Sequence, residues 1–312
     1  MKVYIPQDID IAGKRYLTDR GYQLKIGTST AEDVMKKEIA DCDGVIIRVA
    51  KLPASVIEAA PKLRVIARHG VGTDNIDIAA ATRLGIRVTN GPYSNSESVA
   101  EHTVAFIMAL AHQLVKLDSG VREGDWDIRN RIRLTEMHGK TVGLIGCGRI
   151  GRAVARRLAL GLDMKVLTYG TRHPEKLPDY VELTGSLEEL LQRSDFVSIH
   201  CPSTPETKGL ITMKYLSMMK KDAFLVNTAR GDVINEQDLY QALTEGMIKG
   251  AALDVLSEEP ASCGHPLLSL PNVIFTPHCA SHTNESFANM AVHAAMGVDE
   301  VLSGKTISWP VN

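Results

Sequence analysis

Short runs of β-branched and apolar residues alternate with helical patterns along this chain, and this alternation restricts its possible folds more than any other feature. Strands that alternate with helices form parallel βαβ units, whose strands are buried on both faces of the sheet. The first series of expected strands is Val3–Ile5, Gln23–Ile26, Val45–Val49, Val65–Arg68 and Arg87–Thr89. The second series is Thr141–Ile145, Lys165–Tyr169, Phe196–His200, Ala223–Val226, Gly250–Leu253 and Val273–Thr276. The sequence therefore predicts an α/β fold with two parallel sheets.

Two long helical patterns separate the two series of strands from each other and from the C-terminal tail. Ser98–Leu117 and Asn284–Leu302 are apolar on most faces, which is typical of helices buried between domains or in a subunit interface. A length of 312 residues also corresponds to about two domains. We expect residues 1–95 plus 285–312 to form one domain and residues 96–284 to form the other.

Composition excludes several classes of partner and location. Lys and Arg number 35 and Asp and Glu 37, so the net charge of −2 favours neither nucleic acid nor an anionic membrane as a partner. The five cysteines show no CxxC spacing, which argues against a disulfide framework and a zinc cluster. The N-terminal residues lack a signal-peptide pattern, and the apolar stretch Val104–Ala111 is far shorter than the ~18 residues of a membrane span. We expect a cytoplasmic protein.

A glycine motif follows the first strand of the second series. Gly146, Gly148 and Gly151 form GxGxxG together with Cys147, Arg149 and Ile150, and the segment opens an expected helix over Arg149–Leu160. Such glycines allow a tight turn, close approach of a pyrophosphate and close packing of helix on strand. The free N–H groups and partial positive charge of the helix N-terminus then favour the anion. The motif predicts a dinucleotide site.

The end of the next strand bears on which dinucleotide binds. NAD enzymes usually place Asp or Glu about 20 residues after the motif, against the ribose 2′-hydroxyl. Gly170 stands there instead, followed by Thr171, Arg172 and His173. The guanidinium of Arg172 could bind a 2′-phosphate through two hydrogen bonds, so NADP is favoured over NAD. The alternative is a surface loop in which this Arg is only solvated, and the chain then uses NAD.

Several separated motifs share one order with a known family. They are Gly70–Asp77, Ser98–Glu101, His200–Pro202, Thr204–Thr207, Asn227–Gly231, Asp254–Val255, Glu259–Pro260 and Pro277–His278. Over nearly its whole length the chain resembles the D-isomer-specific 2-hydroxyacid dehydrogenases. The resemblance implies a Rossmann dinucleotide-binding domain inserted in a flavodoxin-like substrate domain.

By the same resemblance, Arg230, Glu259 and His278 are the catalytic residues. The chemistry of 2-keto acid reduction fits these residue types. A guanidinium can hold the carboxylate and polarise the ketone, and an imidazole can transfer a proton in either direction. A carboxylate beside the imidazole orients the ring and favours its protonated form. Each residue alone could be a strand cap, a loop acid or a core histidine, but all three follow expected parallel strands, where ligand sites of α/β folds lie.

The resemblance also implies contacts to the ligands. The backbone N–H groups of Val71 and Gly72 would bind the substrate carboxylate. Asp254 would meet the nicotinamide carboxamide. Further residues along the cofactor would be Pro202, Thr204, Thr228 and Ala229.

A metal site is not expected. His278 and His282 stand four residues apart, but they lie in an expected loop without a further ligand cluster nearby.

The substrate stays open between two subgroups. Arg48 and Asn95 look like residues that contact a phosphorylated substrate in 3-phosphoglycerate dehydrogenases, although Val49 and Ala50 depart from the polar or basic residues of some members. The NADP-type loop is more usual in glyoxylate and hydroxypyruvate reductases. A third reading, from another class, is a dinucleotide-sensing corepressor-like binding module, which can keep the same three catalytic residues; the absence of long flanking tails argues against it.

The family resemblance also implies a homodimer. The expected contacts are the helix Ser98–Leu117 and the arm Val121–Met137, with Trp126 as an anchor. Packing of the helix within its own domain is the alternative.

Overall fold

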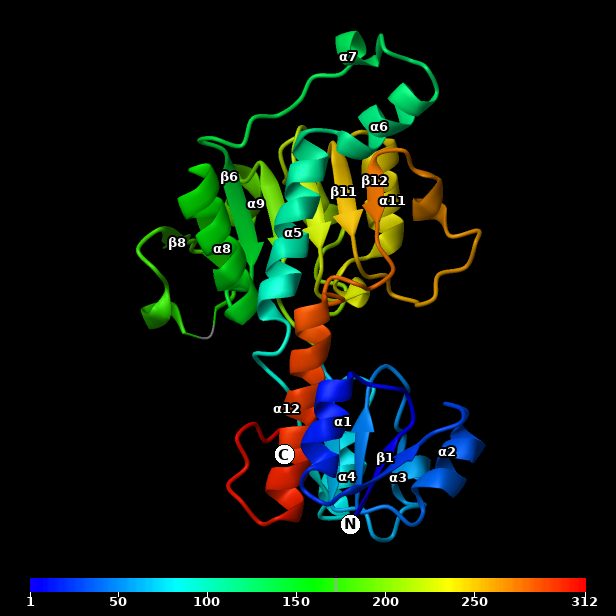
Figure 1. Cartoon of the computed structure of the whole chain (residues 1–312). Helices are drawn as coiled ribbons and strands as arrows, with labels where there is room; N and C mark the ends of the chain where they lie inside the picture. Colours follow the sequence, from blue (N-terminus) through cyan, green and yellow to red (C-terminus); the bar gives the residue numbers. More distant parts are fainter. Residues whose placement is uncertain (172) are drawn as a thin grey trace. The chain divides into compact units, whose positions relative to one another are not determined.

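The chain forms two compact units in a computed structural model, which describes residues 1–171 and 173–312. Unit 1 is Met1–Ser96 with Ser281–Asn312, and unit 2 is Glu97–Ala280 (Figure 1). The boundaries expected from the sequence lie one and four residues away from these. Each unit has its own parallel sheet and its own core, so each is described by itself.

Unit 1 contains a five-stranded sheet in the order β2-β1-β3-β4-β5, with parallel pairs throughout. Its strands are β1 Lys2–Ile5, β2 Gln23–Ile26, β3 Gly44–Ile47, β4 Val65–Arg68 and β5 Arg87–Thr89. Its helices are α1 Ile11–Thr18, α2 Glu32–Ile39, α3 Ala54–Ile57, α4 Ile78–Arg83 and α12 Asn284–Leu302. This strand order is that of flavodoxin-like folds, as predicted.

Unit 2 contains a seven-stranded parallel sheet in the order β12-β11-β10-β9-β6-β7-β8. Its strands are β6 Thr141–Ile145, β7 Lys165–Tyr169, β8 Val181–Leu183, β9 Phe196–Ile199, β10 Phe224–Asn227, β11 Gly250–Leu253 and β12 Val273–Phe275. Its helices are α5 Ser96–Ala111, α6 Leu114–Arg122, α7 Ile128–Arg131, α8 Arg149–Leu162, α9 Leu187–Arg193, α10 Met213–Leu216 and α11 Glu236–Thr244. Three 3₁₀ turns complete the unit: Pro174–Lys176, Gly231–Val233 and Pro266–Ser269. The chain order reverses between β6 and β9, which is the switch point of a Rossmann fold and confirms the predicted fold class.

The helix expected over Ser98–Leu117 is in fact two helices. α5 ends at Ala111, and Gln113 adopts a left-handed conformation with φ of 50° before α6 begins at Leu114. A left-handed residue cannot continue a right-handed helix, so the axis bends by 60°. The apolar face of α5, including Phe106, Ile107 and Leu110, packs in the core of unit 2. In the described part of the chain no single helix is long and apolar enough to cross a membrane, and only the bent pair α5–α6 passes that test of length and composition.

Strand β3 is shorter than the expected Val45–Val49. It ends at Ile47, because the backbone N–H groups of Val49 and Ala50 donate to Gln7 Oε1 at 3.0 and 2.8 Å rather than to a neighbouring strand. The alternating pattern of apolar residues cannot reveal this side-chain competitor.

Candidate active site

The glycine loop joins β6 to α8 as the sequence predicts. Gly146 has a φ of 93°, and a Cβ at Gly151 would lie 2.6 Å from the Gly146 carbonyl oxygen. A Cβ at Gly148 would meet no atom within 4 Å, so the N-terminus of α8 is open to a ligand at that point. Arg149 and Ile150 form the first turn of α8, with Arg149 exposed and Ile150 half-buried. The loop therefore has the form needed to hold a pyrophosphate.

The loop after β7 lacks a carboxylate at the expected position. Gly170 is exposed with a φ of 78°, and the half-buried Thr171 accepts a hydrogen bond at its hydroxyl from the His173 N–H at 3.3 Å. His173 Nδ1 lies 3.2 Å from Glu175 Oε1. Arg172, the residue expected to hold a 2′-phosphate, lies outside the described residues.

His278 and Glu259 form the central pair of unit 2. His278 Nδ1 lies 2.6 Å from Glu259 Oε2, and the Leu256 N–H donates to Glu259 Oε1 at 3.0 Å. His278 follows β12 with a φ of 50°, an uncommon conformation for a residue other than glycine, and half of its side chain is exposed. Its backbone N–H donates to the Asp254 carbonyl at 2.8 Å, which fixes the turn.

The positive charges around Glu259 lower the pKa of its carboxyl. Partial burial raises the pKa of this carboxyl, but the hydrogen bond from His278 and the positive charges of His278 and Arg230 outweigh it, so the net pKa lies below the ordinary value. Arg230 is half-buried after β10, with its guanidinium donating to the Ala229 carbonyl at 2.7 Å. The three residues predicted to be catalytic thus share one region at the carboxyl edge of the sheet.

Asp254 is buried after β11 and holds the turn that carries His278. Its carboxylate accepts hydrogen bonds from the Thr276 hydroxyl, from the Cys279 N–H at 2.8 Å and from the Ala280 N–H at 3.0 Å. His102 Nε2 lies 3.0 Å from the same Thr276 hydroxyl. The sequence did not point to His102 or Thr276. The residue pattern of α5 does not show which of its polar side chains contacts a residue far along the chain.

The other residues expected to contact the cofactor lie along the same edge of the sheet. Thr228 is buried and shares a hydrogen bond of 2.8 Å with Thr103 of α5. The Ala229 N–H donates to Asn227 Oδ1 at 3.0 Å. Pro202 is exposed, and the Thr204 N–H donates to the Thr207 hydroxyl at 2.8 Å.

Potential metal ligands converge in unit 2, although the sequence predicts no metal site. His102, Asp254 and Cys279 place one ligand atom each within 4.8 Å of one another, whereas His282 packs edge-on against the Phe287 ring. Hydrogen bonds through Thr276 account for the first cluster. The expectation of no metal stays a prediction.

The residues expected to bind substrate lie in unit 1, in the loops that follow β3, β4 and β5. The Arg48 guanidinium donates to the Asp8 carbonyl at 2.7 Å and lies over the Phe287 ring, and burial lowers its pKa. Within the described residues neither the Val71 nor the Gly72 N–H donates a hydrogen bond, so both are available to an anion. Asn95 Oδ1 is buried without a hydrogen-bond partner in the described part of the chain.

His69, which sequence reasoning missed, lies in the same part of unit 1. It is buried at the end of β4, and burial together with the charges of Arg48 and Arg68 lowers its pKa to about 3. It is therefore neutral at physiological pH.

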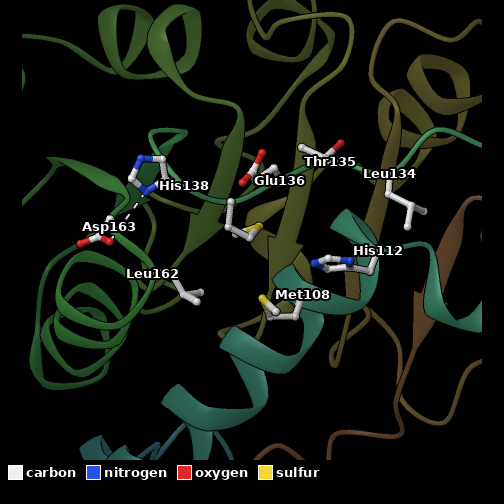
Figure 2. A pocket seen from close by; sticks show the side chains of 9 residues that line it. Met108, His112, Leu134, Thr135, Glu136, His138, Leu162 and Asp163 are labelled. Atoms are coloured by element: carbon white, nitrogen blue, oxygen red, sulfur yellow. Dashed lines mark ion pairs between the residues drawn. The ribbon is translucent and has the colours of Figure 1, made fainter.

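A separate hollow lies at the other end of β6 (Figure 2). Its lining residues are Met108, His112, Leu134, Thr135, Glu136, Met137, His138, Leu162 and Asp163. The Gly139 N–H donates to the Asp163 carbonyl at 3.1 Å just before β6 begins. The hollow is therefore at the amino end of the strand, opposite the glycine loop.

Comparison with known proteins agrees with this arrangement. Residues 104–280 match the model of the D-isomer specific 2-hydroxyacid dehydrogenase NAD binding domain. The D-3-phosphoglycerate dehydrogenase of Methanocaldococcus jannaschii is 40% identical over 293 residues, which cover 93% of this chain and 55% of that protein. The glyoxylate reductase of Korarchaeum cryptofilum is 40% identical over 301 residues, which cover 93% of this chain and 89% of that protein. The chain spans 55–59% of the length of two archaeal phosphoglycerate dehydrogenases that it matches.

Solved structures share the fold over the full length. A protein from Thermus thermophilus has a TM-score of 0.91 at 36% identity, with 100% of both chains covered. An acyclic imino acid reductase in complex with NADPH and D-Arg has a TM-score of 0.88 at 28% identity, covering 100% of this chain and 99% of that one. An NAD-dependent formate dehydrogenase from Staphylococcus aureus in complex with NAD has a TM-score of 0.87 at 31% identity, covering 98% and 97%.

The Rossmann unit, its glycine loop and the residues at its carboxyl edge define a dinucleotide-binding α/β protein. More specifically, the chain belongs to the D-isomer specific 2-hydroxyacid dehydrogenase family. This family binds NAD(P), and its relatives named here are dehydrogenases and reductases, so the corepressor-like reading is not favoured.

Proposed function

We propose that this chain is an NAD(P)-dependent oxidoreductase that interconverts a small 2-keto acid and the corresponding D-2-hydroxy acid. The observation that carries the proposal is the His278–Glu259 pair at 2.6 Å, held near Arg230 at the carboxyl edge of the sheet that also carries the glycine loop. A proton donor, a carboxylate partner and a cation are the groups that this reduction requires.

Each residue has a distinct role in the proposed reaction. A bound nicotinamide supplies or accepts the hydride. Arg230 binds the substrate carboxylate and polarises the keto group through its guanidinium. His278 donates a proton to the keto oxygen during reduction and removes it during oxidation, while Glu259 orients the ring and favours its protonated form.

The proposed cofactor preference is NADP over NAD. The missing carboxylate after β7 and the polar residue Thr171 beside Gly170 support it. Structures of related proteins contain NADPH in one case and NAD in another.

Two substrate classes follow from the relatives. Arg48 and Asn95 support a phosphorylated keto acid, as in the phosphoglycerate dehydrogenases. The loop after β7, and the 40% identity to a glyoxylate reductase, support glyoxylate or hydroxypyruvate instead. We place the phosphoglycerate dehydrogenase-like reaction first and the reductase reaction second.

One set of assays tests function, cofactor and substrate together. The steady-state oxidation of NADPH and of NADH is measured with hydroxypyruvate, glyoxylate and 3-phosphohydroxypyruvate. Preference for NADH with the phosphorylated acid would refute the cofactor proposal, and preference for NADPH with the unphosphorylated acids would refute the substrate ranking. Binding of a dinucleotide without turnover of any acid would refute the proposed enzyme.

We also propose that the chain forms a homodimer through α6, α7 and the segment that follows. Large apolar side chains are exposed there: Leu114, Val115, Val121, Trp126 and Leu134. Figure 1 shows α6 and α7 on a segment that extends away from the sheet of unit 2. Light scattering should give twice the monomer mass of 34.0 kDa, and Trp126→Ser should shift the mass toward the monomer. A monomeric wild-type mass would refute this. Cytoplasmic location stays a prediction.

A further inference from the structure

Glu236, the first residue of α11, accepts three hydrogen bonds from one neighbouring segment. Its Oε1 accepts from the Ser257 N–H at 2.7 Å, and its Oε2 accepts from the Ser257 hydroxyl at 2.7 Å. Its Oε2 also lies 3.1 Å from His265 Nε2. The Glu236 and His265 side chains are only 16% and 17% exposed, so water competes little for these bonds.

The contacts tie both ends of the segment 257–265 to one carboxylate. Glu259 lies inside this segment, two residues after Ser257. A segment fixed at both ends has far fewer conformations than one fixed at a single end. The position of the Glu259 carboxylate therefore depends on Glu236, although the two side chains are not partners of each other.

The start of this segment also packs directly on the backbone that follows Arg230. Gly231 packs so closely on the adjoining backbone that a Cβ there would lie 1.9 Å from the Leu256 carbonyl carbon and 2.3 Å from the Ser257 nitrogen. Leu256 in turn donates its N–H to Glu259. The path from the Arg230 segment to Glu259 is thus made entirely of direct contacts.

Ser257, His265 and Glu236 do not form a nucleophilic triad. His265 meets Glu236 through Nε2, and its Nδ1 is buried without a hydrogen-bond partner in the described part of the chain. The tautomer that carries its proton on Nε2 donates to Glu236 and leaves no base facing the Ser257 hydroxyl. Holding the segment in place is the function that these contacts support.

We propose that Glu236 is a positioning residue, which holds the segment 257–265 so that Glu259 stays against His278 Nδ1. Its effect on turnover rests on the proposed function, whereas its effect on the geometry does not. The proposal adds a residue outside the Arg230, Glu259 and His278 set.

The test compares Glu236→Ala, Glu236→Gln and a matched control, Glu258→Gln, in the full chain. The Ala variant loses all three bonds, whereas the Gln variant keeps an oxygen for the Ser257 N–H but presents an NH₂ group that cannot accept from His265. Glu258→Gln removes the same charge from an exposed neighbour of Glu259 and should leave activity unchanged. We measure amide hydrogen exchange at Leu256, the carboxyl titration of Glu259 by NMR, and kcat/KM against pH.

In the Ala variant we expect Leu256 exchange to accelerate by about tenfold or more. The Glu259 titration and the acid limb of kcat/KM should move to higher pH, because the carboxyl no longer meets His278. We expect kcat/KM to fall by about 10- to 100-fold, with the Gln variant in between. A merely structural role would lower stability without moving the pH profile.

Unchanged Leu256 exchange and Glu259 titration in a folded Glu236→Ala variant, or in Glu236→Gln if the Ala variant does not fold, would overturn the proposal. If both change while the wild-type chain reduces no keto acid, the positioning role stands and the proposed function fails. The two failures are therefore distinguishable.

Discussion

At the scale of single residues, Glu259 combines partial exposure with a strong local partner. Its side chain is 36% exposed, yet its pKa is held below the ordinary 4.5. A carboxyl with a lowered pKa contributes stability that is complete above its unfolded pKa and is lost as the pH falls through the lower folded pKa. The His278–Glu259 pair should therefore stay intact at pH 4.5, the ordinary pKa of the carboxyl, and be lost only as the pH falls further through the lower pKa of folded Glu259.

Glu259→Gln should keep the hydrogen bond from Leu256 but remove the charge that favours the protonated imidazole. We expect kcat/KM for keto acid reduction to fall by about 10- to 100-fold, because His278 loses the carboxylate that orients its ring. Steady-state kinetics from pH 5 to pH 9 measure this, with Glu258→Gln as the control. Equal losses of kcat/KM in both variants would show that activity depends on the net charge of this segment rather than on the His278–Glu259 pair.

His200 gives a second prediction at this scale. It lies beneath the glycine loop, where a Cβ at Gly146 would be 3.1 Å from its carbonyl carbon, and burial lowers its pKa to about 4. The unfolded chain takes up this proton near pH 6.5 and the folded chain does not, so stability falls as the pH drops between those values. Between pH 7 and pH 5 the wild type should lose up to about 2 kcal/mol more unfolding free energy than His200→Gln. Denaturant titrations at both pH values measure the difference, and equal losses would contradict it.

At the scale of elements, α1 and α12 approach so closely that one glycine is required. A Cβ at Gly13 would lie 2.6 Å from the Ala291 carbonyl oxygen of α12. Gly13→Ala should force the helices apart and lower the unfolding free energy by about 1–3 kcal/mol. Gly161→Ala in α8 is the matched control, because a Cβ there meets no atom within 4 Å, and it should stabilise by up to about 1 kcal/mol. A neutral Gly13→Ala would contradict the packing argument.

At the scale of the whole molecule, unit 1 depends on a segment from the far end of the chain. Residues of α12, such as Ala295 and Val298, are fully buried with Val3 and Ile5 of β1. The C-terminal residues also bind the sheet of unit 1, since the Val311 N–H donates to the Val88 carbonyl of β5 at 2.8 Å. Removal of this apolar surface takes away a large part of the core that holds the first sheet.

Truncation after residue 280 should therefore unfold unit 1 and leave unit 2 intact. Limited proteolysis of the truncated chain should degrade residues 1–96 and leave a fragment near 97–280 that still binds a dinucleotide. The full-length chain under the same conditions is the control. Protection of residues 1–96 in the truncated chain would show that α12 is dispensable.

Much of the fold and the candidate site could be predicted from the sequence, because the signals are local. The strands of both sheets other than β8, the extent of α12 and the turn at Gly146 follow from periodicity and glycine placement over a few residues. Strand β8 was not predicted, because its three residues are too few to show a pattern. Residues that follow parallel strands must meet at one edge, so the neighbourhood of Arg230, Glu259 and His278 also follows from order along the chain.

The tertiary structure alone decided where some elements end and which contacts hold the site residues in place. The break at Gln113 and the loss of Val49 from β3 depend on backbone conformation and on a side chain 42 residues away. Glu236 meets His265, and His102 meets Thr276, across 29 and 174 residues. Periodicity reports only which face of an element is apolar, whereas such contacts exist only after the elements have packed. Local patterns therefore indicate the class of fold and the candidate catalytic residues, while the contacts that hold those residues in place arise only when distant segments pack together.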